Sequence, residues 1–235
     1  VHPGNTAGIG TNVIKISVNE IVFLPMLHYT VSKEQERPTF QFQSNMSPAG
    51  RFPGPPSGKR GICMLLTKYD AENALVDARM ENPGPWVAHS RYVAMACENI
   101  AKQCPGLDPY DAYVYGLLHD IGRHAGVSSE RHLIDGYRYC MARGWEKAAQ
   151  ICISHAFMIQ DIASSIGVFD MPQADKAFLS RFVKSAVYDD YDRLVQLCDA
   201  LALPTGFCLL EKRFVDVTLR YGVHPATVDR WKAVL

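Results

Sequence analysis

The spacing of apolar and polar residues divides the chain into two parts. From residue 64 onward, apolar residues recur every three or four positions, as between Pro85 and Ile100, which is typical of helices that bury one face. Residues 1–63 show no sustained helical period, although Val13 to Phe23 alternates loosely enough for one or two short strands. We therefore predict an all-α domain over residues 64–235, preceded by a mostly irregular N-terminal extension.

Helix-boundary signals refine this picture. Asp108 followed by Pro109 predicts an N-cap and a proline in the first helical position, and Gly122 stands where a C-terminal glycine is expected. The helix between them should run from Tyr110 to Asp120. By similar signals we expect helices over residues 67–78, 85–100, 128–144, 145–155, 172–187, 189–204, 207–221 and 225–235.

Composition supports an extension rather than a second domain at the start of the chain. Residues 1–63 hold seven of the fourteen prolines and seven of the seventeen glycines, but only nine of the forty-eight charged residues. Low charge with frequent Pro and Gly is typical of a linker. The domains expected are therefore 1–63, irregular or weakly structured, and 64–235, helical.

The net charge of the chain is zero and its pI is about 7.2. A balanced charge gives no extended basic surface, so neither a nucleic acid polymer nor an anionic membrane is expected as a partner. An anionic substrate would have to be held locally, by a metal ion or by a few cations.

Cysteine usage and hydropathy bear on the compartment. The seven cysteines are odd in number, form no CxxC pair and mostly fall in apolar helical stretches, which favours reduced thiols in a cytosolic protein. The apolar stretch from Ile21 to Leu27 contains Pro25 and is too short to span a bilayer. The chain also begins without the pattern of a signal peptide, so a cytoplasmic location is expected.

Histidines carry the candidate chemistry. Five of the eight lie between residues 89 and 155, and four of them, His89, His119, His132 and His155, fall on four different predicted helices. Histidines distributed in this way are typical of a site assembled inside a helical bundle. Asp120 follows His119 directly, and neighbours on a straight helix point about 100° apart, but at a helix end both can turn inward.

Two further features favour a metal. Asp199 lies in the nearly wholly apolar stretch LVQLCDALAL, where a buried carboxylate is costly unless it is paired with a cation. His132 and Gly136 share one helix face, and we interpret the glycine as space for close packing of a neighbouring helix around a metal.

The order of these residues resembles the HD superfamily of metal-dependent phosphohydrolases, most closely its small stand-alone members of the HDIG type. The resemblance covers residues 64–202, and its most specific parts are GLLHDIGR and YDRLVQLCDALAL. It implies a helical bundle with a one-metal ligand set of His89, His119, Asp120 and Asp199. Two added ligands, His132 and His155, would make this a two-metal site.

The resemblance further implies an enzyme that uses one or two divalent transition-metal ions. Mixed imidazole and carboxylate ligands suit Fe, Mn, Co, Ni or Zn alike. Two ions would activate a shared water as hydroxide, with Asp120 bridging them. Arg123 and His124 follow the motif and are candidates for pairing with a phosphate or protonating a leaving group, so the predicted catalytic residues are Asp120, Arg123 and His124.

Departures from better-defined subfamilies leave the substrate open. Ala156, rather than a second histidine, follows His155 and no GYP motif follows, and HDIGRH lacks the acidic pair of the alarmone hydrolases. The leading hypothesis is a phosphomonoesterase or phosphodiesterase acting on a small phosphorylated metabolite or nucleotide. The alternatives are a di-iron oxygenase acting on a phosphonate or polyol, and a nucleotide-binding regulatory domain.

Overall fold

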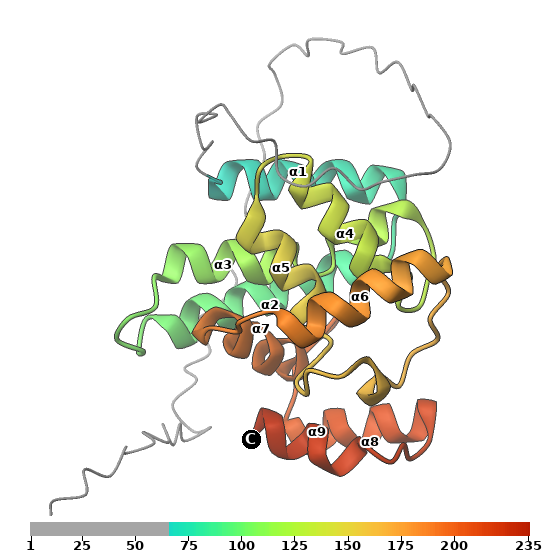
Figure 1. Ribbon diagram of the computed structural model, residues 1–235. Coiled ribbons are helices and arrows are strands. Elements are labelled where there is room, and N and C mark those ends of the chain that lie inside the picture. Colours follow the sequence, from blue (N-terminus) through green and yellow to red (C-terminus); the bar gives the residue numbers. More distant parts are fainter. Residues whose placement is uncertain (1–65) are drawn as a thin grey trace, which may run out of the picture. The chain divides into compact units, whose positions relative to one another are not determined.

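The computed structural model describes residues 66–235. The predicted extension over residues 1–63 and the short strands expected from Val13 to Phe23 lie outside the described residues. Nearly all the regular secondary structure of the described part is helical (Figure 1), as the apolar spacing predicts. Its elements are α1 (Lys68–Glu81), α2 (Pro85–Ala101), α3 (Pro109–Leu118), the 3₁₀ helix η2 (Ile121–Ala125), α4 (Arg131–Met141), α5 (Glu146–Ser154), the 3₁₀ helix η3 (Ile162–Ser164), α6 (Gln173–Ser185), α7 (Asp190–Leu201), β1 (Ala202–Leu203), β2 (Gly206–Phe207), α8 (Leu210–Tyr221) and α9 (Thr227–Val234).

Side-chain caps set several helix starts. The Asp108 side chain accepts a hydrogen bond from the backbone N–H of Tyr110, which confirms the predicted start of α3. Thr67 and Asp70 form a capping box at α1, and Asp189 and Asp192 form another at α7. Each cap satisfies backbone N–H groups that have no partner inside the helix, so these short polar residues determine where the helices begin.

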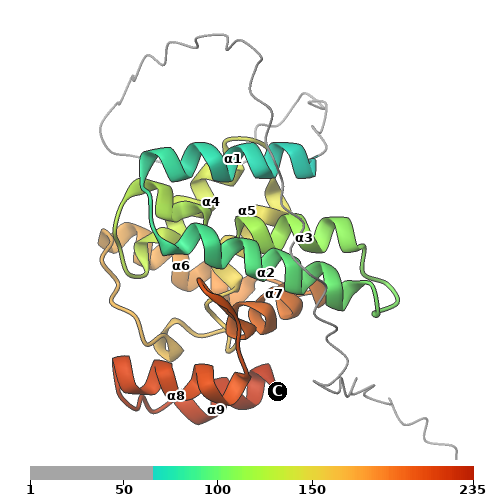
Figure 2. The same ribbon diagram turned by 180° about the vertical axis from the view of Figure 1, so that it is seen from behind.

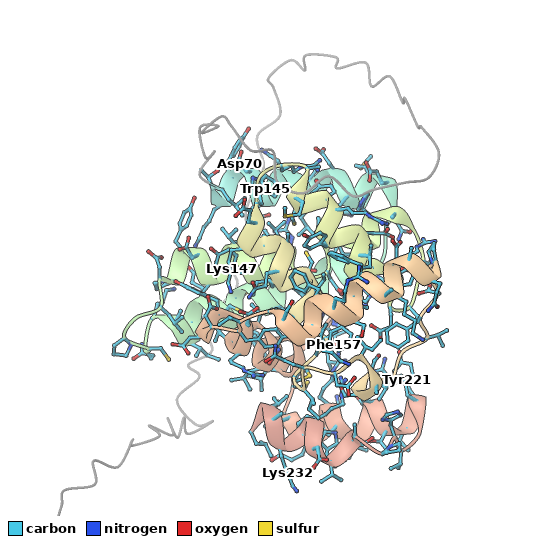
Figure 3. The ribbon with its side chains drawn as sticks, viewed as in Figure 1. Asp70, Trp145, Lys147, Phe157, Tyr221 and Lys232 are labelled. Carbon is cyan, nitrogen blue, oxygen red and sulfur yellow. The ribbon has the colours of Figure 1, made fainter. Side chains whose placement is uncertain are left out.

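Helices α2 and α3 lie against each other at the centre of the domain, with α1 on one side and α7 on the other (Figures 1 and 2). A Cβ at Gly116 of α3 would lie 2.9 Å from the Ala94 Cα of α2, so the two backbones approach closely there. A separate apolar cluster joins α4, α5 and α6 around Phe157, which Figure 3 labels beneath α6. The packing of α2 and α3 places the residues that follow α3 inside the domain.

The chain turns sharply after α3, and the reason differs from the prediction. Helix α3 ends at Leu118, with His119 as its C-cap, and a 3₁₀ helix follows. Gly122 does not end the helix in the left-handed backbone conformation, because it is not one of the glycines with a positive φ. Instead, a Cβ at Gly122 would lie 1.9 Å from the carbonyl oxygen of His132 and 2.3 Å from the backbone nitrogen of Gly136. Gly122 is therefore required by the contact between η2 and α4.

Gly136 takes part in the same contact. Its Cβ position would lie 3.0 Å from the Cys152 Sγ of α5 and 3.2 Å from the Gly122 nitrogen. The close packing of a neighbouring helix that was expected at this glycine is confirmed, and the atoms it meets belong to Cys152 and to the Gly122 backbone. The two glycines bring η2, α4 and α5 together by backbone proximity, and this sets the separation between Asp120 and His132.

A buried ion pair joins α5 to α7. The Asp192 side chain is fully buried and accepts hydrogen bonds from Ser154 Oγ at 2.5 Å, Lys147 Nζ at 2.7 Å and Gln150 Nε2 at 2.9 Å. Figure 3 labels Lys147 on α5. Asp192 lies two turns before Asp199 and could, from the sequence, be a solvated or substrate-contacting carboxylate; the structure makes it a structural one that holds α7 against α5.

Helices α8 and α9 form a pair, which we call the cap, at the end of the domain opposite α1 (Figures 1 and 2). A two-residue antiparallel ribbon leads into it, with Ala202 paired to Phe207. The sequence did not predict this ribbon, and α8 begins three residues later than expected. The rings of Phe214 and Trp231 stack with their centroids 4.9 Å apart and join the two cap helices. Arg230 Nη1 donates to the carbonyl oxygens of Ala156 and Ser164 and so ties the cap to the rest.

Two remaining features concern cysteines and membranes. Among the described residues no disulfide joins the six cysteines, of which four are buried and two, Cys104 and Cys208, are only partly buried. Cys63 lies outside the described residues.

Over residues 66–235, no helix has the length and apolar character needed to cross a bilayer.

We predict that Gly122→Ala destabilises the fold by about 3 kcal/mol or more, because the new methyl group meets backbone atoms that cannot move aside. Urea unfolding followed by circular dichroism measures the change. Gly106→Ala is the control: φ is +95° there but no atom lies within 4 Å, so only backbone strain of about 1–2 kcal/mol is expected. Equal losses in the two variants would contradict the packing role of Gly122.

We predict that Asp192→Ala lowers the free energy of unfolding by about 3 kcal/mol, because it leaves the Ser154 and Gln150 donors without their buried acceptor and removes one of the two carboxylates paired with Lys147. Thermal and urea unfolding measure this loss. The control is Asp190, an exposed residue in the same helical turn. Asp190→Ala should lower the free energy of unfolding by about 0.5 kcal/mol, because only the interaction of its carboxylate with the helix dipole is lost. A loss below about 1 kcal/mol in Asp192→Ala would show that the network is not structural.

Candidate metal centre

The structure brings all six predicted ligand side chains together. They come from six different helices or helix ends, and five of the six are buried, while Asp199 is partly exposed. The contributing residues are His89 on α2, His119 at the end of α3, Asp120 at the start of η2, His132 on α4, His155 at the end of α5 and Asp199 on α7.

On one side of the cluster, two histidines face Asp199. His89 Nε2 lies 2.8 Å from Asp199 Oδ1, and His119 Nε2 lies 3.9 Å from the same oxygen. The ligand atoms of these three residues lie within 4.8 Å of one another, close enough to hold one metal ion. This group joins α2, α3 and α7.

On the other side, Asp120 is the shared residue. Asp120 Oδ2 lies 3.8 Å from His119 Nε2, while Oδ1 lies 3.2 Å from His132 Nε2 and 3.8 Å from His155 Nε2. His119, Asp120 and His155 form a second group with the spacing needed to hold a metal. His132 contacts Asp120 but belongs to neither compact group. Asp120 thus lies between two sets of imidazoles.

Backbone carbonyls orient three of the imidazoles. The Nδ1 of His119 lies 2.7 Å from the Gly116 oxygen, that of His155 lies 3.1 Å from the Ile151 oxygen, and that of His132 bonds the Ser129 oxygen. Because a carbonyl can only accept, each Nδ1 carries the proton and each Nε2 keeps its lone pair. The lone pairs point into the cluster, which is the usual orientation of metal-bound histidine.

The cluster contains buried atoms with no hydrogen bond. Among the described residues, neither His119 Nε2 nor Asp120 Oδ1 has a hydrogen-bond partner. His132 Nε2 is near Asp120 Oδ1, but with its proton on Nδ1 it is an acceptor facing an acceptor. Unpaired buried acceptors are costly, and a cation satisfies several of them together. The residues present therefore fit a divalent metal ion.

Protonation states also suit coordination. Burial lowers the pKa of His119, and lowers that of His155 to about 4. Burial opposes ionisation of Asp120, but the Arg123 guanidinium holds the pKa of that carboxyl well below its usual value. The His89 contact does the same for the pKa of Asp199. At neutral pH His119 and His155 are therefore neutral and both carboxylates ionised, the forms that bind metals.

Arg123 and His124, predicted together, lie in different places. Arg123 Nε donates to Asp120 Oδ2 at 2.7 Å, and its Nη2 lies 3.5 Å from His132 Nε2. His124 instead pairs through Nδ1 with Glu81 Oε2 at 2.6 Å and packs beside the Tyr139 ring. Of these two residues, Arg123 lines the cavity at the cluster and His124 does not, so the structure brings Arg123 alone to the site.

A cavity of about 610 Å³ opens beside the cluster. The domain supplies Trp86, Arg123 and Glu130 to its wall, and the cap supplies a second set of side chains. The cap residues are Arg213, Phe214, Val217, Arg220, Tyr221, Arg230, Trp231 and Val234.

From the sequence, Lys212 and Arg213 could reach a phosphate from a late helix, but a charged outer face explains them equally well. Lys212 is exposed and does not line the cavity, whereas Arg213 Nη2 lies 3.9 Å from Asp199 Oδ1. The repeat of Arg213, Val217 and Arg220 at helical spacing was the available signal for the others. It could not show which face of α8 meets the cavity.

Residues 65–131 match the family model of the HDOD domain. This HD-like, all-helical match covers α1 to η2, and so includes His89, His119 and Asp120. The other three residues of the cluster lie beyond it, and the match spans well under half of the chain. No curated protein and no solved structure gives a significant match to the chain.

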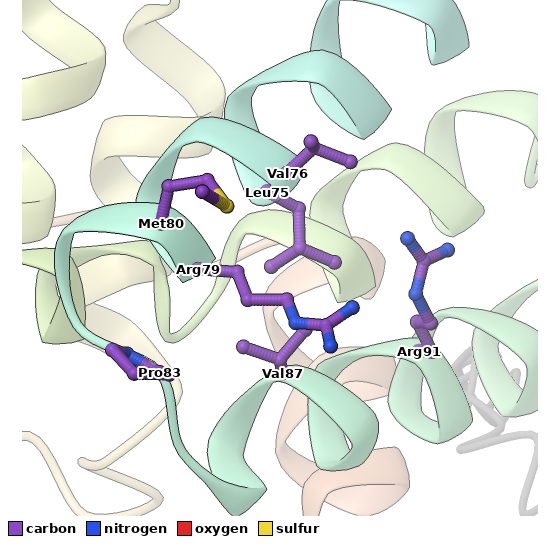
Figure 4. A pocket seen from close by; sticks show the side chains of 7 residues that line it. All are labelled: Leu75, Val76, Arg79, Met80, Pro83, Val87 and Arg91. Atoms are coloured by element: carbon purple, nitrogen blue, oxygen red, sulfur yellow. The ribbon is translucent and has the colours of Figure 1, made fainter. Parts of the chain in front are cut away.

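Another hollow of about 450 Å³ lies between α1 and α2 of the HD-like region (Figure 4). Leu75 and Val87 face each other across it, and Arg79 reaches over them. Its lining contains no histidine, cysteine or carboxylate. The groups needed for metal chemistry are therefore concentrated at the larger cavity.

We predict that the purified chain binds divalent metal and that Asp120→Ala loses at least one equivalent per chain, because Asp120 contacts both groups of imidazoles. Elemental analysis after dialysis measures the content. Asp175→Asn is the control: Asp175 is also buried but binds Arg138 away from the cluster, so this variant should lose stability and keep its metal. Unchanged metal content in Asp120→Ala would refute the assignment.

Proposed function

We propose that this chain is a metal-dependent phosphohydrolase acting on a phosphoester of a small metabolite or nucleotide. One observation carries the proposal: a buried carboxylate, Asp120, stands between two sets of histidines at the wall of a cavity lined with arginines. This arrangement joins a metal-binding donor set to a surface that attracts anions. The functional domain on this proposal is residues 64–235.

Each ligand has a role in this scheme. His89, His119, Asp120 and Asp199 would hold one ion, and Asp120, His132 and His155 a second. Divalent ions bound there polarise a phosphoryl oxygen and lower the pKa of a bound water, so that hydroxide is available near neutral pH. The carbonyl bonds to Nδ1 keep three of the histidines in the required orientation, which limits the reorganisation needed on metal binding.

Arg123 would position the phosphoryl group. Its Nε is held by Asp120, while the rest of the guanidinium faces the cavity beside His132. A planar guanidinium binds two phosphate oxygens at once, which fixes the orientation of the phosphoryl group as well as its charge. His124 has no part in this scheme, because its imidazole is paired with Glu81 outside the cavity.

We predict that Mn²⁺ or Co²⁺ stimulates phosphate release from at least one member of a broad phosphoester panel. Asp120→Asn should reduce the rate at least about 100-fold, because it removes a ligand charge shared by both metal groups. Asp175→Asn, which leaves the cluster intact, should retain activity at temperatures where it stays folded. Colorimetric phosphate release measures both variants.

The same assay separates the competing functions. Phosphate release that is equal in wild type and Asp120→Asn would contradict the proposal. Purification with two irons, together with oxygen consumption on a phosphonate or polyol and no phosphate release from esters, would instead identify an oxygenase built on the same donors. Tight nucleotide binding by metal-loaded protein that turns over no substrate would identify a regulatory domain.

A further inference from the structure

Each of the two carboxylates in the metal cluster has an arginine beside it. Arg123 Nε donates to Asp120 Oδ2 at 2.7 Å, and Arg213 Nη2 lies 3.9 Å from Asp199 Oδ1. One imidazole is close to both carboxylates: His119 Nε2 lies 3.8 Å from Asp120 Oδ2 and 3.9 Å from Asp199 Oδ1. The two arginines therefore meet the same cluster, one through each carboxylate.

Arg213 has unused hydrogen-bond donors. Its side chain forms no hydrogen bond with residues 66–235, and among them Asp199 provides the only carboxylate within 4 Å. At 3.9 Å the two groups attract each other without a hydrogen bond. The side chain is 21% exposed and lines the cavity beside the cluster. Because a guanidinium carries several N–H donors, Arg213 can bind an anion in the cavity without breaking an existing bond.

Arg123 interacts with the same pair of carboxylates. Burial opposes the charged form of Arg123, but Asp120 and, more weakly, Asp199 raise its pKa. Arg123 is therefore within electrostatic range of the carboxylate that Arg213 faces. Both arginines also line the same cavity. An anion bound at the cluster thus lies in the positive potential of two guanidiniums.

A short hydrogen-bonded connection places Arg213 beside Asp199. The antiparallel ribbon β1–β2 follows α7 directly, and after it the Cys208 N–H donates to the Leu201 carbonyl oxygen at 2.9 Å. Arg213 is the fourth residue of the helix that begins two residues later. Backbone hydrogen bonds thus hold the start of α8 near the end of α7. The guanidinium is brought to the cluster by the backbone, and its own donors stay free.

A cation beside a metal ligand has two possible roles. It can only neutralise the ligand carboxylate, or it can bind an anion at the metal. An arginine that serves a carboxylate typically donates short, charge-assisted hydrogen bonds to it, as Arg123 does to Asp120. Arg213 does not do so with Asp199. Its longer separation and free donors favour the second role.

We propose that Arg213 is a second phosphoryl-positioning residue, which together with Arg123 binds non-bridging oxygens of the phosphoryl group at the metal cluster. This rests on the proposed function, because the ligand is the phosphoryl group of that reaction. Arg213 belongs to α8, outside the residues that match the HDOD model. The cap is therefore part of the active site and supplies a residue that touches the substrate.

The test measures the binding of inorganic phosphate to the full chain by calorimetry, with and without saturating Mn²⁺. In the condition where the wild type binds more tightly, Arg213→Gln should bind phosphate roughly ten-fold or more weakly, the value of one charge-assisted hydrogen bond. Arg213→Lys should lose less, because it keeps the charge without the planar pair of donors. Lys212→Gln is the matched control: it removes the same charge from an exposed neighbour outside the cavity and should bind phosphate like the wild type.

The affinity for Mn²⁺, measured in the same variants, separates the two roles. If Arg213 only neutralises Asp199, Arg213→Gln should bind Mn²⁺ more tightly, because a competing cation is gone, and phosphate as tightly as the wild type. That result would overturn the proposal. Thermal unfolding checks the fold, which should be kept because the side chain forms no hydrogen bond with the described residues. If Arg213→Gln does unfold, Arg213→Lys must still bind phosphate more weakly than the wild type.

The role of Arg213 is also refuted if the wild type binds no phosphate, or if Lys212→Gln loses as much affinity as Arg213→Gln. Phosphate release from esters, measured separately, keeps this apart from the proposed function. Phosphate binding that depends on Arg213, without turnover of any ester, would leave the anion site standing and remove the hydrolase. Turnover and phosphate affinity that are both unchanged in Arg213→Gln would do the reverse.

Discussion

The backbone contact between η2 and α4 is the constraint on which the candidate site depends. Gly122 lies so close to the His132 carbonyl and the Gly136 nitrogen that no side chain fits between them. This contact turns the chain immediately after His119, so that Asp120 faces inward at the same level as the histidine. It also places His132 within 3.2 Å of Asp120. A methyl group at Gly122 would alter both the helix packing and the ligand geometry.

The cluster concentrates polar atoms inside an apolar core, and other parts of the fold compensate for this. Backbone carbonyls bind three imidazoles from the outside, and the Lys147–Asp192 pair holds the helix that carries Asp199 against the one that ends at His155. What these contacts leave unpaired are acceptors directed at one another. A cation is the group that satisfies acceptors in that arrangement. Stability and metal binding are therefore linked through the same few side chains.

The cap shows how a chain of zero net charge can place charges of one sign on one side of a helix pair. Equal numbers of acidic and basic residues exclude a broad basic surface, but they do not determine where each charge lies. In α8 and α9 the arginines line the cavity and the carboxylates do not. The charge that faces the cavity is therefore set by the placement of individual residues and not by the net charge.

Much of this protein could be predicted from the sequence, because the information is local. Apolar residues at helical spacing and the cap at Asp108 predicted the helices, and the adjacent His119 and Asp120 with dispersed histidines predicted the cluster that the structure brings together. Local signals failed where a residue's role depends on a distant partner. Gly122 has the sequence context of a helix terminator, and Asp192 that of a solvated carboxylate.

Only the tertiary structure decided those roles, as well as the separation of Arg123 from His124 and the placement of Arg213 and Arg230 in the wall of the cavity. The physical reason is that the free energy of a close glycine contact, or of burying a carboxylate or a guanidinium, depends on which atoms the neighbouring helix presents there. The spacing of residues along one helix determines which of them share a face. It does not determine what that face meets.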